Sequence, residues 1–117
     1  MANTDFLKNG AVWKDCDGET IHAHGGCILK YGKYFYWYGE DRRENYYISC
    51  YRSKDLIHWE HLKPAIARDT LGHIFSGSSI VDHNNSAGYG KDAMIAFYTS
   101  ASDEHGQIQC MAYSNDN

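Results

Sequence analysis

This sequence of 117 residues has little proline and no long apolar run. It also lacks a cluster of basic residues that is free of acidic neighbours. It holds one proline, and no stretch approaches the apolar length of a membrane span, so we expect no membrane partner. Residues 1–5 do not have the features of a secretory signal peptide. The chain as written is therefore expected in the cytoplasm, or secreted if a leader was removed.

Nucleic acid is excluded as a partner by the charge. The formal net charge is −4, and phosphate binding requires clustered Lys and Arg. The one basic pair, Arg42-Arg43, sits beside Glu40, Asp41 and Glu44 and is locally neutralised.

The four cysteines form no Cys-x-x-Cys pair, which argues against zinc-ribbon and redox motifs. They are Cys16, Cys27, Cys50 and Cys110. The last three lie inside apolar strand patterns, where cysteine behaves as a small hydrophobe. We expect buried thiols at these three positions and no disulfide framework.

Aromatic residues are abundant: ten tyrosines, four phenylalanines and three tryptophans make up 15% of the chain. Aromatic side chains favour strands, and no amphipathic helix of useful length is present. Most of these rings are expected in sheet cores. Aromatic rings also suit carbohydrate binding, where flat apolar sugar faces stack on them.

An internal repeat organises the chain. Residues 33–38 align with 93–98, both aromatic-rich strands, and residues 48–50 align with 108–110 at the same offset. Glycines precede both copies, at Gly25-Gly26 and at Gly77. Repeats of this length, built from strands and tight turns, are typical of propeller blades.

The repeat predicts an all-β fold of about two antiparallel, four-stranded β-propeller blades, forming one partial propeller unit over 1–117. Blade one spans 11–61 and blade two spans 73–117, without its outer strand. Residues 53–59 should form a turn in which Leu56 and Trp59 anchor the outermost strand. Residues 62–71 should be a crossover, with Pro64 preventing a regular helix.

Polar residues at the inner strand ends are the candidate site residues, because propeller blades place these ends around a central pocket. His22 and His24 share a strand face and could form a metal site with Glu40, bind sugar, or be structural. Glu40 could act as an acid or base, accept sugar hydroxyls, or be a solvated loop charge. Glycoside hydrolysis needs two carboxyl groups, and here Glu40 is the single obvious inward one.

The motifs of this chain resemble those of two related families. Residues 17–26 (DGETIHAHGG) and 36–41 (YWYGED) resemble the exo-β-1,3-galactanase-like branch of glycoside hydrolase family 43, a resemblance assigned to residues 11–52. Residues 53–62, 75–82, 98–101 and 107–116 resemble family 32, which holds the levanases, inulinases and invertases; this resemblance is assigned to 53–117. Both families are five-bladed propellers with a pocket at the axis, and the chain is similar to a chimera, a fragment or a divergent relative of them.

The resemblance implies substrate-binding roles for three residues. Glu40 matches a substrate-binding Glu of the galactanase-like branch, and Phe75 and Ser76 match positions lining the sugar subsite of family 32. His24 is the fourth candidate substrate-binding residue, named from its place just before the inner strand of blade one. No catalytic residue, metal or cofactor is implied, because Ala23 occupies the position of the family 32 nucleophile. The stabilising Asp and the general-acid Glu belong to later blades. Family 43 inverts and family 32 retains configuration, and the sequence does not decide between them.

Two functions follow as hypotheses. The first is part of a propeller glycoside hydrolase that keeps some of the sugar-binding wall for a galactan- or fructan-type glycan and is inactive alone. The second is a structural or lectin-like blade module. It would close a propeller as a homo-oligomer or with a complementing chain that supplies the missing blades.

Overall fold

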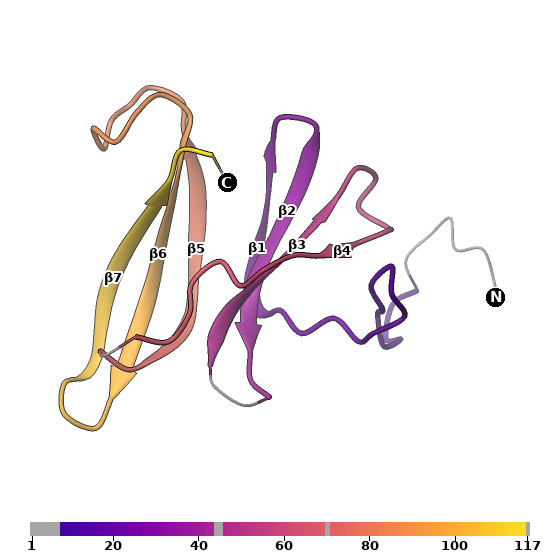
Figure 1. Cartoon of the computed structure of the whole chain (residues 1–117), viewed down its shortest axis with the longest axis horizontal. Helices are drawn as coiled ribbons and strands as arrows, with labels where there is room; N and C mark the ends of the chain where they lie inside the picture. The colour runs from indigo at the N-terminus through magenta and orange to yellow at the C-terminus, as the bar shows by residue number, and fades with distance from the viewer. Residues whose placement is uncertain (1–7, 44–45, 70, 117) are drawn as a thin grey trace.

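The computed structural model describes residues 8–43, 46–69 and 71–116, and this part of the chain is all-β (Figure 1). The first sheet, blade one, has the order β1 (His24–Tyr31), β2 (Tyr34–Asp41), β3 (Tyr47–Ser53), β4 (Glu60–His61). The second, blade two, has the order β5 (His73–Asp82), β6 (Ala93–Ser102), β7 (Gly106–Ser114). All neighbouring strands are antiparallel, and strand order follows chain order, which confirms the predicted fold class. No helix in the described ranges is long and apolar enough to cross a membrane.

The two blades meet along their first strands. β1 packs against β5, and the sheets spread apart from this contact toward β4 and β7 (Figure 1). The sheets span residues 24–61 and 73–114, inside the ranges predicted for the two blades. Residues 1–7 and 117 of the predicted unit lie outside the described residues.

The repeated glycines lie where the strand pairing of β1 and of β5 is irregular, at equivalent places in the two blades. The pairing register shifts between His24 and Cys27 in blade one and between Phe75 and Gly77 in blade two. A Cβ at Gly26 would lie 1.9 Å from the carbonyl oxygen of Tyr38, and one at Gly77 would lie 1.8 Å from that of Phe97. Glycine is required here because the neighbouring strand's backbone occupies the space of a side chain.

The turn after β3 is held by side-chain caps, as predicted. The Ser53 hydroxyl accepts the Leu56 N–H at 2.9 Å, and the Asp55 carboxylate accepts the N–H groups of Ile57 and His58, each at 2.9 Å. Trp59 is buried and anchors the strand that follows. Leu56, predicted to anchor this strand with Trp59, adopts φ 67° and is 37% exposed, so it is much less buried than Trp59.

Most of the buried aromatic side chains belong to blade one. The Trp37 ring lies 5.2 Å from Trp59 and 5.8 Å from Trp13, which the chain before β1 contributes. Farther along the same segment, the His22 N–H donates to the Tyr51 hydroxyl at 3.1 Å. The segment before β1 therefore covers one face of blade one, and the other face is turned toward blade two.

The crossover around Pro64 is strand-like and contains no helix, as predicted. The N–H of Ala65 donates to the carbonyl of Ile48, and the N–H of Ile48 donates to that of Ile66, both at 2.8 Å. The crossover thus extends the edge of blade one where β4 ends.

The four cysteines are free thiols, and only Cys50 is buried. The expectation of buried thiols is wrong for Cys27 and Cys110, which are half-buried. Cys27 faces the space between the sheets, and Cys110 lies on β7, an edge strand with a neighbour on one side only.

Candidate functional site

The four predicted site residues converge where the blades meet. His24 at the start of β1 is paired in register with Glu40 near the end of β2. The Ser76 backbone N–H, next to Phe75 on β5, donates to Oε1 of Glu40 at 2.5 Å. A Cβ at Gly25 would touch the Ser76 Cβ at 3.0 Å, so β1 and β5 approach closely here. Residues far apart in the chain therefore share one end of the blade contact.

Glu40 is a structured carboxylate and not a solvated loop charge. It is 4% exposed, and its second oxygen, Oε2, accepts a hydrogen bond from Nε of Arg42 at 2.7 Å. A buried carboxylate requires such partners, because burial of an unpaired charge is costly. Glu40 therefore links the two blades through one oxygen and holds an arginine through the other.

A pocket of about 260 Å³ opens beside this carboxylate and is lined by Glu40, Arg42, Tyr46 and Phe75. The rings of Tyr46 and Phe75 lie 5.4 Å apart, and the Ile74 N–H donates to the Tyr46 carbonyl at 3.0 Å. We call these four lining residues the junction pocket. It combines apolar ring surface with a hydrogen-bonded ion pair, which suits a ligand with a flat apolar face and hydroxyl groups. His24 and Ser76 lie next to it but do not line it.

The neighbouring carboxylate, Asp41, does not line the junction pocket. Its carboxylate accepts hydrogen bonds from Arg43 through Nε at 3.0 Å and Nη2 at 2.5 Å, and from the Tyr47 hydroxyl at 2.8 Å. The Arg43 hydrogen bonds hold the pKa of Asp41 well below its usual range. Asp41 is an ionised structural group that holds the chain between β2 and β3.

Among the described residues, Glu40 is the one acidic residue that lines the junction pocket, so this part of the chain does not supply the pair of carboxylates that glycoside hydrolysis needs. The rings of His22 and His24 lie 6.3 Å apart. Over the ranges that the structure describes, no group of three or more His, Cys, Asp or Glu could hold a metal ion, so the possible metal site with Glu40 is not formed. The arrangement can bind a ligand but has no pair of groups for acid–base cleavage.

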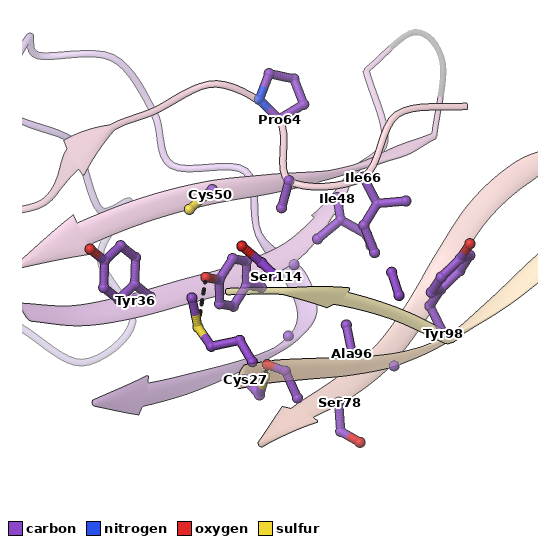
Figure 2. Close-up of a pocket in the computed structure, with 18 of the residues that line it drawn as sticks. Cys27, Tyr36, Ile48, Cys50, Pro64, Ile66, Ser78, Ala96, Tyr98 and Ser114 are labelled. Carbon is purple, nitrogen blue, oxygen red and sulfur yellow. Dashed lines mark hydrogen bonds between the residues drawn. The ribbon is translucent and has the colours of Figure 1, made fainter. Parts of the chain in front are cut away.

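A larger cavity of about 580 Å³ separates the two sheets. Figure 2 shows Tyr36, Ile48 and Cys50 of blade one facing Ala96 and Tyr98 of blade two. The Tyr38 hydroxyl crosses this space and donates to Sδ of Met94 at 3.4 Å.

Chemistry in this cavity is limited by the protonation of its polar groups. Burial raises the pKa of Cys50 to about 11 and raises that of Tyr38 far above its usual value. Both groups are therefore neutral at pH 7, and neither supplies an anionic nucleophile. The cavity is a space between packed blade faces, and its lining also includes the charged residues Arg52, Lys63 and Asp116.

Two residues of the junction pocket, Arg42 and Tyr46, were not among the predicted site residues. Arg42 was read as part of a neutralised charge cluster, yet its i, i+2 spacing from Glu40 places both side chains on one face of an extended chain. That spacing could have identified Arg42 from the sequence. No sequence pattern could have identified Tyr46, because its place in the pocket depends on the contact with β5.

Comparison with known proteins places the chain among glycoside hydrolases. The family described as Glycosyl hydrolases family 32 N-terminal domain matches residues 25–117. The levanase of Bacillus subtilis (strain 168) is 51% identical over 67 residues, covering 55% of this chain and 10% of that enzyme. The levanbiose-producing levanase of the same strain is 37% identical over 110 residues, covering 89% of this chain and 20% of that enzyme.

Among solved structures, the exo-β-1,3-galactanase of Clostridium thermocellum superposes with a TM-score of 0.77 at 31% identity, covering 95% of this chain and 25% of that one. The chain thus spans between a tenth and a quarter of the length of these relatives. Its two sheets form part of a five-bladed propeller fold. The family 32 match begins at residue 25, so it also covers much of residues 11–52, for which the resemblance to family 43 was predicted.

Proposed function

Since the chain belongs to the family of the Glycosyl hydrolases family 32 N-terminal domain, we propose that it supplies part of the sugar-binding wall of a fructan-degrading propeller. The junction pocket is the place where the sugar binds. Binding, and not cleavage, is the activity that these residues support, because one carboxylate among the described residues lines the pocket.

The observation that carries this proposal is the composition and position of the junction pocket. Phe75 and Tyr46 offer ring surface, and the Glu40–Arg42 pair offers fixed polar atoms at the same opening. The Ser76 N–H fixes Glu40 across the blade contact. Sites of this kind, mostly apolar with a few convergent polar groups, bind small ligands.

A β-fructan unit is the ligand that we favour over a galactan unit. Both relatives compared above by sequence are levanases. The similarity to an exo-β-1,3-galactanase is a similarity of fold, with 31% sequence identity. Titration with the two glycans decides between them.

Phe75→Ala should weaken the binding of levan-derived oligosaccharides about fivefold or more, because the sugar loses a stacking surface. Isothermal titration calorimetry measures the affinity of the intact chain and of the variant. Tyr89→Ala is the matched control, since it removes a ring that is 38% exposed in the loop between β5 and β6, at the other end of β5. Equal affinities for the Phe75 variant and the unaltered chain, or a preference for β-1,3-galactotriose, would refute the fructan site.

A second candidate function is a blade module that assembles with copies of itself, and the outer face of blade two favours it. The side chains of Ile80, Phe97, Met111 and Tyr113 share this face and are between 42% and 60% exposed. The edge strand β7 carries no charged residue, so two copies meet there without like-charge repulsion.

We expect light scattering at micromolar concentration to give a mass above that of one chain, and Phe97→Asp to lower it to the mass of one chain. Ile28→Asp, on an equally exposed side chain of β1, should leave the assembly unchanged. A single-chain mass for the unaltered protein would rule this candidate out.

A further inference from the structure

Two adjacent arginines follow β2, and each pairs with a buried carboxylate. Arg42 pairs with Glu40 and Arg43 pairs with Asp41, and the side chain of each arginine is 52% exposed. Only Arg42 lines the junction pocket. Alternation along an extended chain explains the difference, because it directs residues 40 and 42 to one face and residues 41 and 43 to the other.

The two arginines differ in the number of guanidinium nitrogens that donate to the paired carboxylate. Arg43 donates to Asp41 from both Nε and Nη2. Among the hydrogen bonds of the described residues, Arg42 donates through Nε alone, to Oε2 of Glu40 at 2.7 Å. A guanidinium group carries five N–H donors in a fixed plane. Within the described part of the chain, the terminal Nη donors of Arg42 therefore remain for a ligand.

Glu40 is placed to hold Arg42 and presents little of its own surface to a ligand. Both of its oxygens accept hydrogen bonds, from the Ser76 N–H and from Arg42, and the residue is 4% exposed. Arg42 is the more exposed member of the pair at the pocket. The polar surface available to a sugar there belongs mainly to the arginine.

We infer that Arg42 is the specificity-determining donor of the junction pocket and that Glu40 is the residue that positions it; this rests on the proposed sugar-binding function. The guanidinium edge presents parallel N–H groups that match two oxygens on neighbouring carbons. Glu40 cancels the charge of Arg42, so the pair offers no net attraction to an anion. The ligand class is therefore a neutral sugar with two adjacent hydroxyl groups, contacted on its other side by Phe75.

The test compares Arg42→Gln with Arg43→Gln in the intact chain, titrated with levan-derived oligosaccharides. Removing the charge-assisted donor should weaken binding about tenfold or more in the Arg42 variant. The Arg43 variant should bind within about twofold of the unaltered chain, since Arg43 does not line the pocket. Arg52→Gln, which breaks an ion pair with Glu60 between β3 and β4, is a second control should the Arg43 variant fail to fold.

Glu40→Gln tests the positioning role separately, through the Nε–H signal of Arg42 in a ¹⁵N NMR spectrum recorded without sugar. Loss of the carboxylate should shift and broaden that signal. An unchanged signal would overturn the positioning role.

The sugar titration also separates this inference from the proposed function. Binding by the unaltered chain and equal binding by the Arg42 variant would overturn the inference and leave the proposed function standing. No binding by the unaltered chain would overturn both.

Discussion

Gly77→Ala is expected to destabilise the chain by at least about 3 kcal/mol, because the new methyl group has no space. Its carbon would lie 1.8 Å from the carbonyl oxygen of Phe97 and 2.7 Å from the Tyr98 Cα. These are backbone atoms of β6, which pairs with β5 along nearly its whole length. The strands would have to separate at the irregularity that also brings Ser76 to Glu40. The substitution should therefore disturb both the sheet and the junction pocket.

Urea denaturation followed by tryptophan fluorescence measures this effect, with Gly88→Ala as the control. Gly88 adopts φ +86° but has nothing within 4 Å of the position of a new Cβ. Alanine there should cost only about 1 kcal/mol, the price of a left-handed backbone for a residue with a side chain. Equal losses of stability in the two variants would contradict the steric account of Gly77.

Trp59→Ala is expected to destabilise the chain by about 3–5 kcal/mol, the usual cost of removing a buried aromatic side chain. Trp59 is 2% exposed, and its ring lies 5.2 Å from that of Trp37 at 64°. Its carbonyl accepts the Cys16 N–H at 2.8 Å, which ties the segment before β1 to blade one. The indole N–H has no hydrogen-bond partner among the described residues, so the expected loss is one of packing.

Leu56→Ala is the matched control for this prediction, since both residues belong to the turn between β3 and β4. Leu56 is 37% exposed, so its truncation should cost less than about 0.5 kcal/mol. Urea denaturation followed by far-ultraviolet circular dichroism compares the two variants. Similar losses would show that the turn, and not the indole, anchors blade one.

The repeat made the strands of both blades predictable from the sequence. The aligned runs 33–38 and 93–98 predicted β2 and β6, and the aligned residues 48–50 and 108–110 lie in β3 and β7. These features are local, because strand propensity, turn residues and caps such as Asp55 act within a few residues of one another. The exposure of Leu56 was not predictable in the same way, since it follows from the φ angle that the turn adopts.

The candidate site was predictable only in part, because it depends on contacts between the blades. Glu40 was named from its position at a strand end, and Phe75 and Ser76 were named from the resemblance to family 32; the structure places all three near the blade contact. The burial of Glu40 required the Ser76 N–H from 36 residues away. The involvement of Tyr46 required its packing against Phe75. Separations of this size leave no periodic signal in a sequence.

Backbone amide NMR of the ¹⁵N-labelled chain, titrated with levan-derived oligosaccharides, tests the central claim most directly. Signals of residues 39–42 and 74–77, which surround the junction pocket, should shift with added sugar. Signals of Cys27, Cys50 and Met94 in the cavity between the sheets should stay in place. Shifts confined to that cavity, or no shifts at any sugar concentration, would contradict the claim that the junction of the two blades is a sugar-binding site.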